Sequence, residues 1–131
     1  MTIAHQLTQL AAELRTATGA AVWLDRADVT RVGIHVTPRG YPIIATLGGV
    51  VGLGVAVTVI GADIGERYAS DTLGAMLTDT IQAMMISPNI DIIANSDGSW
   101  STATMFEPRP DLPQLPAWRI LANTFYPDDN D

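Results

Sequence analysis

The two histidines, His5 and His35, are the residues best suited to acid–base or metal chemistry in this chain. A metal site built from two distant histidines and scattered aspartates would show no ligand spacing, and none of the usual zinc spacings is present. No serine lies in a Gly-x-Ser-x-Gly turn, which presents the nucleophile in many hydrolases. The chain has no cysteine, which excludes thiolate catalysis, disulfides and cysteine metal sites. We therefore expect no enzyme activity, no bound metal and no cofactor.

Residues 48–54 form a glycine-rich run, Gly-Gly-Val-Val-Gly-Leu-Gly, which invites comparison with a phosphate-binding loop. Such loops continue into Lys and Ser or Thr and open a helix, and neither feature follows here. We interpret the run as a turn that leads into a strand with one thin face. A helix or another subunit could approach such a face closely.

The charge of the chain disfavours nucleic-acid binding. Its 14 acidic and 7 basic residues give a formal net charge of −7, and every basic residue is an arginine. The arginines are scattered and form no basic stripe, so the chain repels phosphate backbones.

A chain of 131 residues suits one domain. We expect that domain over residues 1–127, followed by a solvated acidic tail over residues 128–131.

One segment requires a membrane test, because residues 40–62 contain no charged side chain and are long enough to cross a bilayer. The segment also contains several glycines, Pro42 and many valines, and its second half alternates large and small residues. A period of two is typical of a strand. The N-terminus lacks the basic leader of a secretory signal. We therefore expect strands here and no membrane partner.

Two amphipathic helices are predicted. The first spans residues 2–18, with Thr2 as its N-cap and Gly19 in the left-handed position at its end. The second follows a loop over residues 61–68, begins at a cap at Ser70 or Asp71, and ends before Pro88. The expected polar face of the first helix consists of Gln6, Gln9, Glu13 and Arg15.

The remaining apolar runs predict strands near residues 21–25, 32–36, 50–60, 91–95, 99–106 and 117–126. Residues 38–42 should break the second strand, and residues 43–47 then form an extended arm or a short strand. A hairpin turn at residues 95–98 should pair the two strands beside it. Hairpins dominate this order, so we predict an α+β fold with a mostly antiparallel sheet and two helices packed on one face.

The core is predicted from the apolar faces of these elements. His35 alternates with Ile34 and Val36, which directs it toward solvent or a partner. The aromatic residues Trp100 and Phe106 and the methionines Met84 and Met85 are interpreted as core residues. The side chains expected to be largely buried are Leu7, Leu10, Leu14, Leu73, Leu77, Ile81, Val55, Val57, Trp118 and Ile120.

Taken as a whole, the order of elements resembles that of the phage tail terminator (tail-completion, minor tail U-like) proteins of long-tailed phages. The resemblance rests on the opening helix, Gly-Ala-Ala-Val-Trp at residues 19–23 and Val-Gly-Ile-His-Val-Thr-Pro at residues 32–38. It continues through the long strand before the second helix. The last matching pieces are Ser-Trp-Ser-Thr-Ala at residues 99–103 and Leu-Pro-Ala-Trp-Arg-Ile at residues 115–120. Residues 40–49 depart from the pattern and look like an insertion.

The resemblance implies a structural virion protein, located in the tail or neck and assembled in the host cytoplasm. Such proteins form a ring, usually a hexamer, that caps the tail tube and joins it to the head–tail connector, with DNA only passing through the lumen. Three segments that could reach a neighbouring subunit are residues 39–47, the loop at 61–68 and the proline-rich loop at 107–116. The candidate interface residues are Arg39, Tyr41, Ile43, Ile44, Leu47, Asp63, Glu66, Arg67, Arg109, Leu112 and Leu115.

Two other readings of the sequence remain open. A head-completion or neck protein of the same virion would have a similar composition. A small bacterial ligand-binding or enzymatic domain would instead be a monomer or dimer with a defined pocket. The oligomeric state and the position in an assembled particle separate these classes.

Overall fold

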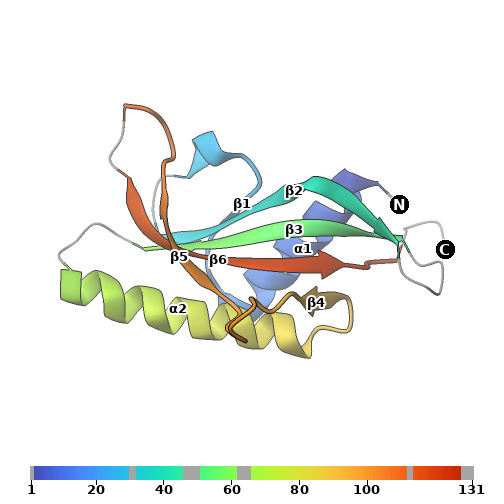
Figure 1. Ribbon diagram of the computed structural model, residues 1–131. Helices are drawn as coiled ribbons and strands as arrows, with labels where there is room; N and C mark the ends of the chain where they lie inside the picture. The colour runs from blue at the N-terminus through green and yellow to red at the C-terminus, as the bar shows by residue number, and fades with distance from the viewer. Residues whose placement is uncertain (1, 30–31, 46–50, 62–65, 112–113, 128–131) are drawn as a thin grey trace.

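The computed structural model describes residues 2–29, 32–45, 51–61, 66–111 and 114–127. Two helices pack on one face of a long twisted sheet of six strands (Figure 1). The fold is therefore α+β, as predicted. In order along the chain, the elements are α1 (Ile3–Thr18), β1 (Val22–Trp23), the short 3-10 helix η1 (Arg26–Asp28), β2 (Gly33–Ala45), β3 (Val51–Ile60), α2 (Glu66–Ile86), β4 (Ile90–Ile92), β5 (Thr102–Phe106) and β6 (Leu115–Thr124).

The sheet is mostly antiparallel. Its strand order is β1-β2-β3-β6-β4, and β5 pairs with β6 beside this path. Only β1 and β2 run parallel, through Val22 opposite Ile34 and Trp23 opposite His35. The sheet thus centres on β3 and β6, which pair along eight positions from Leu53 to Ile60.

The first helix has the predicted caps. The Thr2 hydroxyl accepts a hydrogen bond of 3.1 Å from the backbone N–H of His5. At the other end Gly19 has a φ of 70° and donates its N–H to the Arg15 carbonyl at 2.9 Å. Both contacts satisfy backbone groups that a helix end leaves unpaired. The apolar spacing and the two cap residues together were enough to predict this helix.

The core lies between the helices and the sheet. Leu10 and Leu14 of α1 meet Val55 and Val57 of β3 and Ile120 of β6, and all five are fully buried. Leu73 is also buried, at 5% exposure. Four residues predicted to be largely buried are only partly so, because they lie at the margins of the packed face: Leu7, Leu77, Ile81 and Trp118.

Strand β3 is buried on both faces from Gly52 to Ile60. The face with Val55 and Val57 meets the helices. On the opposite face, Ile60 joins a smaller cluster with Val29, Phe106 and Ala117. A strand buried on both sides reads as a continuous apolar run, which explains the uncharged sequence of this segment.

Strand β2 continues through the prolines that were predicted to break it. It extends to Ala45, with an irregular register between Pro38 and Ile43. Beyond His35 no described residue pairs with the outer side of β2, because β1 is only two residues long. A proline on such an edge removes no necessary ladder bond. Residues 39–45 are therefore part of the sheet and not a separate arm.

Strands β4 and β5 do not form the predicted hairpin. Both pair with β6, with β4 against Ala122–Thr124 and β5 against Leu115–Arg119. The turn at residues 95–98 exists, with the N–H of Asn95 donating to the Ser99 carbonyl at 2.7 Å. The Asn95 side chain also donates hydrogen bonds to the hydroxyls of Ser99 and Thr102. The turn therefore closes a local loop between β4 and β5 and does not pair the two strands.

The second helix begins earlier than predicted. It starts at Glu66 and ends at Ile86, before Pro88. Residues 66–70 contain no helix breaker, and an acidic residue at the first position favours the positive end of the helix dipole. The last strand begins at Leu115, two positions before its predicted start. The predicted turn at Gly48 and Gly49 and the acidic tail at residues 128–131 lie outside the described residues.

Candidate functional site

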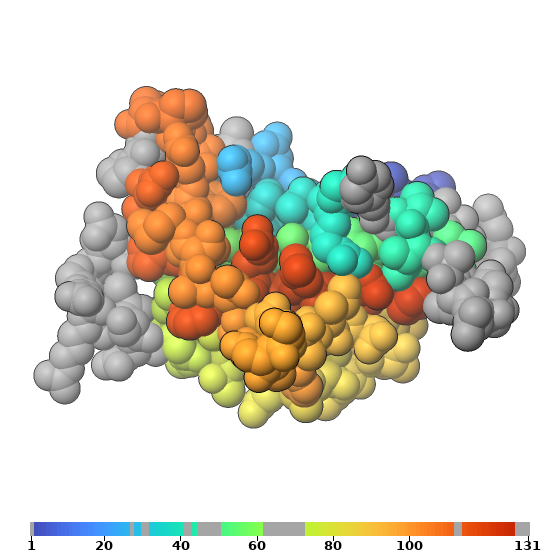
Figure 2. Space-filling view, in the orientation of Figure 1, coloured from blue at the N-terminus to red at the C-terminus, as the bar shows by residue number. Residues whose placement is uncertain are grey.

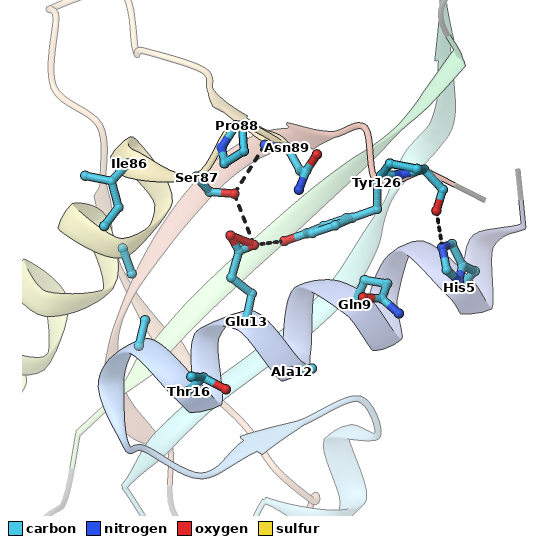
Figure 3. A pocket seen from close by; sticks show the side chains of 13 residues that line it. His5, Gln9, Ala12, Glu13, Thr16, Ile86, Ser87, Pro88, Asn89 and Tyr126 are labelled. Carbon is cyan, nitrogen blue, oxygen red and sulfur yellow. Dashed lines mark hydrogen bonds between the residues drawn. The ribbon is translucent and has the colours of Figure 1, made fainter. Parts of the chain in front are cut away.

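A groove runs between the outer side of α1, the end of α2 and the segment that follows β6 (Figure 3). It has a volume of about 650 Å³. Polar and apolar side chains are mixed on both of its sides. Its lining includes His5, Gln9, Ala12, Glu13, Thr16, Ala17, Ala83, Ile86, Ser87, Pro88, Asn89, Tyr126 and Pro127.

The carboxylate of Glu13 is fixed by two donors at the floor of this groove. The hydroxyl of Tyr126 donates to Glu13 Oε2 at 2.5 Å, and the Ser87 hydroxyl donates to the same oxygen at 3.0 Å. Ser87 also accepts the N–H of Asn89 at 3.2 Å, which holds its hydroxyl in place. Figure 3 shows the carboxylate rising from α1 between Ser87 and Tyr126. Three elements distant in sequence thus meet at one carboxylate.

The Tyr126 hydroxyl is electrostatically constrained. Burial, followed by the hydrogen bond to Glu13 and the charge of that carboxylate, raises the pKa of Tyr126 far above its ordinary range. The hydroxyl therefore stays protonated and remains a donor to Glu13 across the physiological range. It cannot serve as a base there.

Gln6 anchors the same region from inside the protein. Its side chain is fully buried, so the prediction that it lies on the polar face of the helix is wrong. Its amide nitrogen donates to the Tyr126 carbonyl at 2.7 Å, and its amide oxygen accepts the Tyr126 N–H at 2.9 Å. The Thr124 hydroxyl donates to that oxygen at 3.0 Å. Gln6 precedes Leu10 by four positions, so it shares the buried stripe of the helix.

The predicted interface residues lie at opposite ends of the sheet. Arg39, Tyr41, Ile43 and Ile44 lie in β2 at the end where β3 begins. Arg109 and Leu115 lie at the other end, where β3 finishes and β6 begins. Figure 1 also places the start of α2, which carries Glu66 and Arg67, at that second end. Leu47, Asp63 and Leu112 lie outside the described residues.

The thin face of β3 is filled by side chains of the same chain. A Cβ on Gly54 would lie 2.6 Å from Arg39 Nη2, and one on Gly52 would lie 2.5 Å from the Phe125 ring. Arg39 also donates to the Asn123 side chain at 2.5 Å. The expectation that a helix or another subunit approaches these two glycines is therefore wrong. Among the predicted interface residues in β2, Ile43 is 55% exposed.

His35 is buried, contrary to the expectation that it faces solvent or a partner. Only 6% of it is exposed, and its ring centroid lies 5.2 Å from that of Phe106. The guanidinium of Arg26 lies over the Phe106 ring, 5.1 Å from the centroid of that ring. Burial and the nearby Arg26 charge lower the pKa of His35. The cause is β5, which brings Phe106 over the sheet face that the sequence pattern left open.

The end of α2 has an apolar surface that includes Met85, so the prediction of Met85 as a core residue is wrong. Met85 is 56% exposed and Ile86 is 83% exposed. Trp100, predicted to be buried, is 36% exposed and lines a shallow hollow with Met85. Met84, which follows the core stripe, is fully buried as predicted. In Figure 2 the orange segment, residues 102–111, rises to a lobe at the upper left, away from the end of α2.

The described residues contain no cluster of three or more histidine, aspartate or glutamate side chains placed to hold a metal ion. Within the same part of the chain, no helix has the length and hydrophobicity needed to span a membrane. The uncharged stretch over residues 40–62 contributes the end of β2 and all of β3. In comparisons with known proteins, no family model and no curated protein matches this sequence.

Proposed function

We propose that this chain is a structural virion protein that caps the phage tail tube as a ring and joins the tail to the head–tail connector. The proposal rests on the resemblance in element order and on the separation of the predicted contact segments to opposite ends of the sheet. A closed ring requires each subunit to offer two different surfaces, one to each neighbour. Ile43 and Val51 at one end and the lobe at the other are suited to such head-to-tail contacts.

The charge of the chain supports the same proposal. A net charge of −7 per subunit would give a hexameric ring a strongly acidic surface. DNA passes such a wall without being trapped, because like charges repel. The partners would be further copies of this chain, the tail tube protein and the head–tail connector. The protein would act in the tail or neck of the virion after assembly in the host cytoplasm.

Sedimentation with purified tail tubes tests this function. The chain should pellet with the tubes and dissociate from them as a ring, whose mass light scattering would give. Isolated subunits can remain monomeric before a tube end is present, so a monomer alone is compatible with the proposal. If the chain stays in the supernatant at every tube concentration, the proposal is wrong. A head-completion protein would instead bind the connector and leave tubes unbound.

One observation favours a different class of function. The groove beside Glu13 is large enough for a small ligand and has a fixed carboxylate at its floor. A ligand-binding domain would be a monomer or dimer that binds a cationic small molecule saturably, with no dependence on tail tubes. Calorimetry against arginine and simple amines would detect this binding. The size of the native particle would then separate a binding domain from a ring subunit.

A further inference from the structure

The groove beside Glu13 contains an acceptor that the protein leaves unused. Both internal donors, Tyr126 and Ser87, bond to the Oε2 oxygen of Glu13. The Oε1 oxygen accepts no hydrogen bond from the described residues. It is not buried, so a ligand can reach it. A carboxylate held by two donors is already ordered, so a cation that approaches its second oxygen meets a fixed geometry.

The shape and chemistry of the groove suit an arginine side chain. Ala12, Ala17 and Ile86 supply apolar surface for the aliphatic stem of such a side chain. Glu13, Gln9 and Asn89 supply polar groups for its guanidinium. All basic residues of this chain are arginines, so a second copy of the chain could provide the occupant.

Among the described arginines, Arg109 is the best placed to leave its own subunit, because it lies in a projecting segment, whereas the other exposed arginine without an internal contact, Arg119, lies within β6. Arg15 donates to the Val22 carbonyl, Arg26 stacks on Phe106, and Arg39 bonds to Asn123. Arg109 has only an exposed pairing with Asp111 at 3.7 Å, and such surface pairs contribute little. It lies in the segment of residues 107–111, which projects from the body (Figure 1).

Arg109 cannot reach the groove of its own chain. The segment that carries it precedes β6, whereas Tyr126 in the groove follows β6. A strand of 10 residues separates its two ends by about 30 Å, at roughly 3.3 Å for each residue. An arginine side chain is far shorter than this distance. Only another copy, arranged head to tail, can bring Arg109 to Glu13.

We propose that the groove beside Glu13 receives the Arg109 side chain of a neighbouring copy and forms one half of the subunit contact in the ring. This inference rests on the proposed ring, because it names the residues that join adjacent subunits. The contact is heterologous: one end of each subunit offers the arginine, and the other offers the carboxylate.

Cysteine cross-linking tests the contact directly, since the chain has no cysteine of its own. The substitutions Gln9→Cys and Glu107→Cys place one thiol in the groove and one beside Arg109. Oxidation in the presence of tail tubes should give a ladder of covalent oligomers. The matched control combines Gln9→Cys with Asp97→Cys, at an exposed turn outside the proposed contact, and should remain monomeric. Equal ladders from both pairs would overturn the inference.

Charge variants give an independent readout. Arg109→Gln should weaken ring formation about tenfold or more, because it leaves the carboxylate at the contact without its cation. Arg119→Gln removes a charge from β6 that is also exposed and should have no effect. In a Glu13→Gln background, which retains an acceptor for Tyr126, Arg109→Gln should cause little additional loss. Rings that form normally in Arg109→Gln would overturn the inference and leave the proposed function intact. The absence of any ring with tail tubes would overturn both.

Discussion

At the scale of single residues, the C-terminal segment is attached to the protein by polar side chains of α1. Gln6 bonds to both backbone groups of Tyr126, and Glu13 bonds to its hydroxyl. Buried polar groups of this kind stabilise a fold only when their partners are present. The stability of the whole fold should therefore depend on Tyr126 as well as on the apolar core.

Tyr126→Phe should lower the free energy of unfolding by about 1–2 kcal/mol at neutral pH, since it removes one donor to a half-buried carboxylate. Urea unfolding measures this change. Thr8→Ala, at an exposed position of the same helix, is the control and should have little effect. An unchanged midpoint in Tyr126→Phe would mean that the hydrogen bond to Glu13 is replaced by water without cost.

The same substitution should change the dependence of stability on alkaline pH. The folded pKa of Tyr126 is raised above its ordinary value of 10.0, so the unfolded chain releases this proton first. The contribution of Tyr126 is therefore fully present below pH 10.0 and is lost as the pH rises above it. Tyr126→Phe should lose less stability between neutral and strongly alkaline pH than the unmodified chain. Parallel pH curves for the two proteins would contradict this.

Ile120→Ala should cost about 2–5 kcal/mol, because it leaves a cavity where α1 and the sheet meet. Ile120 is fully buried, whereas Leu77 is only half-buried and should cost less when truncated. Ile86→Ala is the matched control at 83% exposure, and its effect should stay within about 0.5 kcal/mol. Denaturation of the three variants under one condition gives the order. Equal losses at Ile86 and Ile120 would contradict the assigned core.

At the scale of elements, most of the fold could be predicted from local pattern. The caps Thr2 and Gly19 and the alternation in β3 correspond directly to the structure. The wrong predictions are those in which tertiary pairing overrides local preference. Pro38 did not end β2, because no described residue pairs with the outer side of the strand at that position. Strand β5 pairs with β6 and does not form the predicted hairpin.

The candidate site was less predictable than the fold. The groove combines α1, the end of α2 and the chain after β6, and no sequence spacing connects Glu13, Ser87 and Tyr126. Gln6 did carry a local signal, since its position on the apolar stripe of α1 indicates burial. The burial of His35 depends on Phe106, which lies 71 positions further along the chain. Such distant contacts are not encoded in a local pattern.

Glycine substitutions test the packing of two elements. In β3, Gly52→Ala would put its Cβ 2.5 Å from the Thr124 carbonyl oxygen, so the backbone of β3 or β6 must shift. The expected result is a loss of about 1–3 kcal/mol. In α2, a Cβ on Gly74 meets nothing within 4 Å. Gly74→Ala should therefore raise stability by about 0.5–1 kcal/mol through helix propensity. Thermal unfolding gives the sign of both changes, and a stabilising Gly52→Ala would contradict the register of β3 and β6.

At the scale of the whole molecule, the two ends of the sheet differ in chemistry. One end has the apolar tip of β2 and the groove with its fixed carboxylate, and the other has the projecting lobe with Arg109. A molecule with two unlike ends can associate head to tail, either as an open filament or as a closed ring. A net charge of −7 opposes random association, so assembly would depend on specific contacts.

The length distribution of growing tail tubes is the measurement that tests the central proposal most directly. Tube protein is polymerised with increasing amounts of this chain, and tube lengths and tube ends are recorded by electron microscopy. A terminator should shorten the tubes in proportion to the amount added and leave a ring at one end of each tube. Tubes that continue to lengthen, with bare ends and the chain unbound, would contradict the proposal.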